Sequence, residues 1–143
     1  MSFAGVSQAA VILAAVTSFL FGGIWYGVFS GPWMVAANVN PARIQGHGKG
    51  GGAILAPYVI AFLGQLVMAF FLAGLLAHLG AGQVTIKNGL LAAASVWAGF
   101  VIAPMAVNHA FQGARPALTL IDGGHWLGVL LLQGAIIGWM GAN

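Results

Sequence analysis

The chain has 143 residues, of which 61% are hydrophobic and only 3% are charged, and its mean hydropathy is +1.00. Soluble domains carry about 25% charged residues, so four basic side chains and one acidic side chain exclude a soluble globular protein. The basic residues are spread over three loops, which excludes a nucleic-acid surface built from clustered cations. The absence of cysteine excludes disulfides and thiol chemistry.

The charged residues divide the chain into long uncharged runs, at residues 1–42, 50–86, 88–114 and 123–143. A helix needs roughly 20 mostly apolar residues to cross about 30 Å of hydrocarbon. The runs therefore predict an all-α integral membrane protein, a single membrane domain over residues 1–143 with four transmembrane helices in two hairpins. We expect these helices at about residues 7–29, 53–79, 89–111 and 123–141.

The first predicted helix has no positive side chain before it, so we interpret it as a permanent span rather than a signal peptide. It ends in Trp25 and Tyr26, and Trp33 follows, as in the aromatic belt of a membrane interface. Two overlapping small-residue spacings, which let another helix approach closely, are formed by Gly23, Gly27 and Gly31.

The loop after the first helix combines a proline, cations and glycines. Pro32 can open a short interfacial helix through Ala37. Gly48-Lys49 is followed by neither Ser nor Thr and no strand precedes it, so we exclude a phosphate loop and nucleotide binding. The residues expected at lipid headgroups or the interface are Trp25, Trp33, Arg43 and Lys49.

The second and third predicted helices are joined by a short turn that carries Lys87. In the third helix, Pro104 deprives the Phe100 carbonyl of its usual donor, so we expect a kink there. Arg115-Pro116 ends this helix. Asp122 is then placed to act as the N-cap of the fourth helix.

Polar side chains are expected to gather at one membrane face, because the ends of helices one and three and the starts of helices two and four share that face. This candidate cluster consists of Tyr26, Tyr58, Asn108, His109, Arg115, Asp122 and His125. Polar groups at membrane depth are costly and tend to be functional. Near the interface the cost is small, so capping and headgroup anchoring are the favoured interpretation.

No catalytic residue and no metal site is predicted. His109, Asp122 and His125 could supply three ligands, but the cap occupies Asp122, and His109 faces another helix. Paired carboxylates for acid–base catalysis are missing, which argues against an enzyme. A tetrapyrrole such as haem or chlorophyll is a minority hypothesis, with His78 or His109 as the axial ligand; no other cofactor is expected.

Loop charges predict the orientation. Arg43, Lys49 and Arg115 lie in two loops that share one face, whereas the opposite loop carries Lys87 alone. The positive-inside rule places the first two loops in the cytoplasm. We therefore expect a protein of the bacterial inner membrane with both termini on the non-cytoplasmic side.

Two sets of residues resemble a small four-helix bacterial membrane family, the domain of unknown function 1761. The first set, in helix one, is Gly22, Trp25-Tyr26, Phe29 and Trp33, and the second, around helix four, is Pro104, Phe111, Gly113, Arg115-Pro116, Leu118, Ile121 and Gly124. The resemblance covers nearly the whole chain, and family members often carry Asn at the position of Asp122. It implies the four-helix fold and no activity.

Two hypotheses for function follow. The first is a non-enzymatic structural or accessory subunit that associates with other membrane chains or with itself, because small-residue faces occur on several helices. The alternative is a small oligomeric channel or transporter whose path is lined by glutamines and whose mouth carries the polar cluster. The glutamines of that path are Gln8, Gln65 and Gln133.

Overall fold

The computed structural model describes residues 7–39, 51–80 and 82–141 of the chain, and all regular structure within these ranges is helical. The elements are α1 (Gln8–Ala36), α3 (Gly51–His78), α4 (Ile86–Val96), the π-helical segment η1 (Trp97–Ile102), α5 (Ala103–Phe111) and α6 (Pro116–Met140). Segments α4, η1 and α5 follow one another without a break, so they form a single rod.

Four helical stretches in the described residues are long and apolar enough to cross a membrane. They are Gln8–Ala36, Leu55–His78, Ile86–Phe111 and Pro116–Met140. The chain is thus a multi-pass membrane protein by the length and composition of its helices. Large apolar side chains are accordingly left exposed on the outer faces, such as Phe100, Phe111 and Leu120.

Two helix boundaries differ from the predicted ones. Helix α1 continues to Ala36, so Pro32 and Trp33 lie inside it and the prediction that Pro32 opens a separate interfacial helix is wrong. Helix α6 begins at Pro116 rather than near residue 123. Asp122 therefore lies within the helix, and the prediction that it forms the N-cap is wrong. The N-cap is Arg115, and Pro116 occupies a first-turn position where its missing N–H is not needed.

The third span contains the π-helical segment η1, which ends at Ile102, two residues before Pro104. Proline has no N–H to donate to the preceding turn, and such wide turns are found where the regular helical ladder is interrupted. The predicted kink at Pro104 and the pairing of the spans into two hairpins stay predictions.

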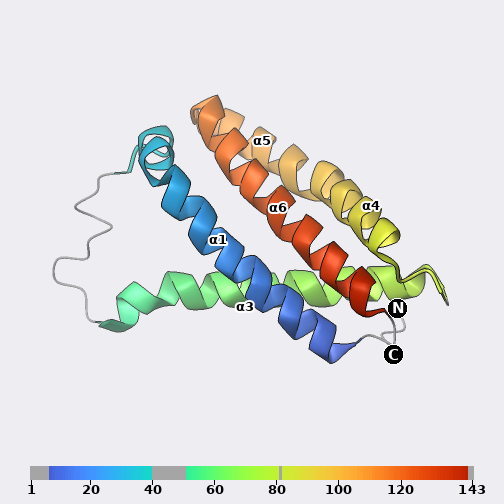
Figure 1. The fold of residues 1–143 in the computed structure, drawn as a ribbon. Coiled ribbons are helices and arrows are strands. Elements are labelled where there is room, and N and C mark those ends of the chain that lie inside the picture. The colour runs from blue at the N-terminus through green and yellow to red at the C-terminus, as the bar shows by residue number, and fades with distance from the viewer. Residues whose placement is uncertain (1–6, 40–50, 81, 142–143) are drawn as a thin grey trace.

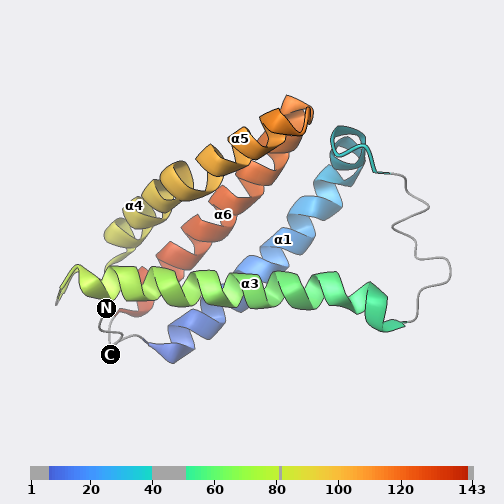
Figure 2. The same ribbon diagram turned by 180° about the vertical axis from the view of Figure 1, so that it is seen from behind.

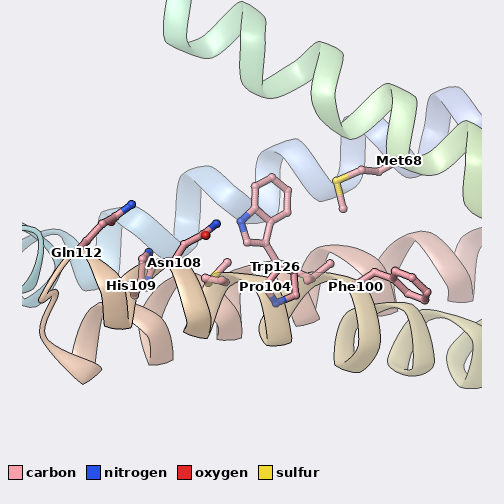
Figure 3. A pocket seen from close by; sticks show the side chains of 9 residues that line it. Met68, Phe100, Pro104, Asn108, His109, Gln112 and Trp126 are labelled. Atoms are coloured by element: carbon pink, nitrogen blue, oxygen red, sulfur yellow. The ribbon is translucent and has the colours of Figure 1, made fainter.

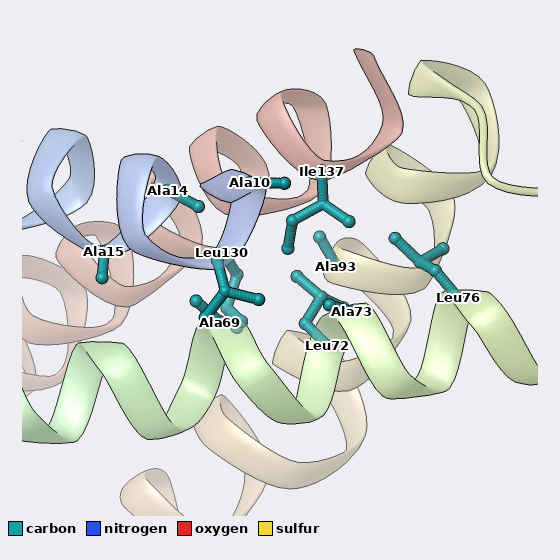
Figure 4. Close-up of a cluster of buried hydrophobic side chains, with 11 residues drawn as sticks. Ala10, Ala14, Ala15, Ala69, Leu72, Ala73, Leu76, Ala93, Leu130 and Ile137 are labelled. Carbon is teal, nitrogen blue, oxygen red and sulfur yellow. The ribbon is translucent and has the colours of Figure 1, made fainter. Parts of the chain in front are cut away.

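Helix α6 lies between α1 on one side and the α4–α5 rod on the other, and α3 crosses these helices obliquely on one face (Figures 1 and 2). The core lies at this crossing and is built largely from alanine and leucine (Figure 4). Its small members, such as Ala14, Ala69 and Ala93, are fully buried. They let the helices approach closely, because alanine adds little bulk between two backbones.

The backbones of α4 and α6 come close together beside the core. A side chain built on Gly89 would run into the Gly134 carbonyl, and one built on Gly134 would run into the Gly89 carbonyl. One turn further along α6, Gly138 lies equally close to the backbone of Thr85. The Gly134 and Gly138 spacing therefore brings two backbones together, as small-residue pairs do in membrane helices.

Candidate functional site

Three tryptophan indoles donate hydrogen bonds to one short segment of α6, Ile121–Gly123. The bonds run from Trp25 Nε1 to the Ile121 carbonyl (3.2 Å), from Trp33 Nε1 to Asp122 Oδ1 (3.0 Å) and from Trp97 Nε1 to the Gly123 carbonyl (2.8 Å). Trp25 and Trp33 belong to α1, and Trp97 belongs to η1. Two neighbouring spans are therefore bonded to the same turn of α6.

The carboxylate of Asp122 joins α6 to α1. Its Oδ1 accepts a hydrogen bond from the Tyr26 hydroxyl at 2.8 Å and a second from the Trp33 indole at 3.0 Å. Tyr26 and Trp33 lie two helical turns apart on α1, so both side chains reach the same face. Both bonds end on the same carboxyl oxygen, so Asp122 links α6 directly to two successive parts of α1.

His125 lies one helical turn after Asp122 and is only 4% exposed. Its ring is surrounded by aromatic side chains, with centroid distances of 6.2 Å to Phe21, 4.8 Å to Tyr26 and 4.8 Å to Trp126. Neither ring nitrogen has a hydrogen-bond partner among the described residues. Buried imidazoles are normally hydrogen-bonded, so His125 presents two unused polar atoms inside the protein.

Gln133 connects three helices deeper in the core. Its Nε2 donates to Ser18 Oγ on α1 and to the backbone carbonyl of Gln65 on α3, both at 3.0 Å. A flipped amide would place oxygen against that carbonyl, so this contact fixes the orientation of the Gln133 side chain. The Oε1 atoms of Gln133 and Gln65 are both buried without a partner in the described part of the chain.

Gly22 connects the histidine with the glutamines. A Cβ at this position would lie 2.8 Å from His125 Nε2 and 3.7 Å from Gln65 Nε2, so both side chains border the same point beside α1. The result, which we call the polar track, is a continuous line of buried or half-buried residues, all with polar side chains except Gly22. It consists of Asp122, Tyr26, His125, Gly22, Gln65, Gln133 and Ser18.

A family model described as "Protein of unknown function (DUF1761)" matches residues 9–138 of the chain. The chain belongs to this family. The match includes every residue of the polar track, so the track lies wholly within the DUF1761 region. No curated protein and no solved structure matches the chain.

The structure brings together three members of the candidate cluster of this DUF1761 protein, Tyr26, Asp122 and His125. It places Tyr58 elsewhere, since the side chain is 61% exposed on the N-terminal half of α3. Arg115 and Asn108 are exposed near the α5–α6 turn. His109 forms a separate contact, between its Nδ1 and Thr119 Oγ1 at 2.9 Å.

Other candidate residues lie apart from the polar track. Gln65 and Gln133 are in contact, but Gln8 is exposed beside a shallow groove between α1 and α3. His78 is exposed at the end of α3. Arg43 and Lys49 lie outside the described residues. Within the described ranges, no three His, Cys, Asp or Glu side chains converge as a metal site would require.

The sequence interpretation missed three members of the site in this DUF1761 protein: Ser18, Gly22 as the buried contact point of His125 and Gln65, and Trp97. Ser18, Gly22 and Tyr26 follow one another at intervals of four residues, a spacing that places them on one face of α1. That spacing was a usable signal. Trp97 had no comparable signal, because its bond to Gly123 depends on how η1 packs against α6.

Proposed function

We propose that this protein is a small channel or transporter that passes a small polar solute between its helices. The supporting observation is the set of buried polar atoms without partners along the track, namely Gln65 Oε1, Gln133 Oε1, His125 Nδ1 and His125 Nε2. An unsatisfied buried polar group costs about 1–3 kcal/mol. Hydrocarbon offers no water to satisfy such groups, so a passing solute is the partner that relieves the cost.

The unpartnered atoms favour one kind of solute. Both amide oxygens accept hydrogen bonds, and a neutral imidazole adds one acceptor and one donor. The single carboxylate, Asp122, already accepts bonds from Tyr26 and Trp33 at one end of the track. The track thus offers mainly acceptors and no free charge in its middle, a combination that suits a small uncharged solute rich in N–H or O–H groups.

Flux through liposomes containing the purified protein tests this proposal. We expect Gln133→Leu and Gly22→Ala each to lower the uptake of urea, glycerol or ammonia by about tenfold, the equivalent of about 1.4 kcal/mol in the barrier. The leucine removes an acceptor from the track, and the alanine methyl occupies the space beside His125 Nε2. Uptake can be followed by stopped-flow light scattering and, for ammonia, by an entrapped pH dye.

The matched control for Gly22→Ala is Gly23→Ala. Gly23 is the neighbouring residue on α1, is exposed, and has no atom within 4 Å of an added Cβ among the described residues. It should leave uptake unchanged. Equal uptake of all three solutes by the wild-type protein, Gln133→Leu and protein-free liposomes would contradict the proposal.

A second candidate function, an accessory subunit, is favoured by the open glycine face of α1. Gly23, Gly27 and Gly31 are exposed, and none has an atom of the described residues within 4 Å of an added Cβ. Such a face is a good contact for another membrane helix. The natural chain lacks cysteine, so Gly27→Cys should crosslink to a second membrane chain in native membranes, whereas the adjacent Val28→Cys should not. Crosslinking of neither would argue against this role.

We also propose that the chain lies in a bacterial inner membrane with both termini on the non-cytoplasmic side. The support is the loop charge balance and the placement of the start of α1 and the end of α6 at the same end of the molecule (Figure 1). An impermeant thiol reagent should then label Lys87→Cys in intact cells and leave Arg115→Cys unlabelled. The reverse pattern would invert the orientation.

A further inference from the structure

A cleft of about 440 Å³ opens between α3, the η1–α5 segment and α6 (Figure 3). This volume lies within the roughly 300–1,000 Å³ typical of ligand sites. Met68 of α3 forms one wall, Phe100 and Pro104 form the opposite wall, and Trp126 of α6 lies between them. The cleft does not belong to the polar track, although Trp126 follows His125 directly in α6.

The lining of the cleft changes from polar to apolar along its length. Asn108, His109 and Gln112 lie at the end where α5 terminates, while Phe100 and Met68 lie at the other end (Figure 3). The His109 ring is held by its contact with Thr119. An occupant must therefore be amphipathic, with a polar group at the α5 terminus and an apolar body along the cleft.

The charges near the polar end favour an anionic group. Arg115 lies in the turn just after Gln112 and is exposed. The only acidic residue of the chain, Asp122, bonds instead to Tyr26 and Trp33 of α1. Arg115 does not line the cleft, but it follows Gln112 by three residues, so an exposed cation lies next to the polar end in the sequence, and no carboxylate is among the residues that line the cleft.

The apolar wall is built by the irregular part of the third span. Phe100 belongs to the π-helical segment η1, whose Trp97 is bonded to Gly123 of α6. Single π-helical turns occur frequently at functional sites, because they redirect side chains that a regular helix would aim elsewhere. The position of Phe100 in this π-helical segment is a second observation, separate from the polar residues, that favours a functional site at the same cleft.

We propose that the cleft binds one anionic phospholipid, with its headgroup at Asn108, Gln112 and Arg115 and one acyl chain lying between Met68 and Phe100. The polar end lies where the third span ends and the fourth begins, at the level where lipid headgroups are found. The acyl chain then runs along the cleft past Trp126. This site does not depend on the channel or transporter role, and it can exist whichever solute is carried.

Quenching of tryptophan fluorescence by brominated lipid tests the proposal with the full chain in bilayers. Brominated phosphatidylglycerol, titrated into unbrominated phosphatidylcholine bilayers, should quench part of the emission with a saturable dependence at low mole fraction. Trp126→Phe should remove that saturable component. Trp139→Phe, which changes a 70% exposed tryptophan outside the cleft, should leave it in place.

A second variant, at an exposed position, keeps the test informative if Trp126→Phe disturbs the fold. Arg115→Gln changes an exposed side chain and should raise the half-saturating mole fraction of brominated phosphatidylglycerol about fivefold, the factor equivalent to about 1 kcal/mol for one charge at an anionic lipid. Brominated phosphatidylcholine should show no saturable component. Quenching that rises linearly with mole fraction for both lipids, or that is equal for wild type and Arg115→Gln, would overturn the proposal.

Discussion

Replacing Gly134 with alanine is expected to separate α6 from α4 and to lower the free energy of unfolding by about 1–3 kcal/mol, the usual penalty for overpacking a core. The added methyl group would meet the Gly89 carbonyl, which is backbone and cannot move aside as a flexible side chain can. The reciprocal change, Gly89→Ala, would meet the Gly134 carbonyl. We therefore expect both substitutions to destabilise the chain to a similar degree.

The measurement is unfolding by denaturant in mild detergent, followed by tryptophan fluorescence. Gly99→Ala is the matched control, because Gly99 lies on the same span as Gly89 and has no atom within 4 Å of an added Cβ in the described structure. Gly99→Ala should be neutral or slightly stabilising, since alanine favours a helix more than glycine does. A Gly134→Ala variant as stable as Gly99→Ala would show that α4 and α6 do not pack as described.

Replacing Asp122 with alanine is expected to lower the free energy of unfolding by about 3 kcal/mol, because the Tyr26 hydroxyl and the Trp33 indole both lose their acceptor. Replacement with asparagine should cost only about 1 kcal/mol, since the amide keeps an oxygen in the place of Oδ1. Denaturant unfolding of the two variants in the same detergent checks the difference.

The Asp122 series has an internal control in Tyr26→Phe. This substitution removes only the hydroxyl donor, so its loss of stability should be smaller than that of Asp122→Ala and should largely disappear when the two are combined. Additive effects of Tyr26→Phe and Asp122→Ala would mean that the hydrogen bond does not link α1 to α6. Equal losses for asparagine and alanine would assign the stabilisation to the negative charge rather than to the acceptor geometry.

The number of helices could be predicted from the sequence, because uncharged runs long enough to cross a membrane are visible without any knowledge of packing. The residues at which the helices begin and end were harder to predict from the sequence. Pro32 was expected to begin a new helix, yet α1 continues through it, and Pro116 was assigned to a loop although it begins α6. Proline is compatible with a helix start and with a helix interior in membranes, so the position of a proline alone does not show whether a helix begins there.

The site was predictable only where helical spacing carries the information. Tyr26 and Gly22 share a face of α1 by their spacing, and Gln65 and Gln133 were expected to line a common path. Contacts between helices had no such signal. The exposure of Tyr58 follows from the oblique crossing of α3, which depends on the small residues packed at the core. The angle at which α3 crosses the other helices cannot be predicted from the sequence pattern.

The three indole bonds to Ile121–Gly123 have a consequence for the order in which the protein assembles. Helix α6 is made after the other described helices, yet it packs against α1, α3, α4 and α5 and accepts the bonds of Trp25, Trp33 and Trp97. Chains fold from the N-terminus during synthesis, so the three indole donors are made before their acceptors on α6 exist. An intermediate that lacks α6 therefore has none of the three hydrogen bonds that join α1 and η1 to Ile121–Gly123.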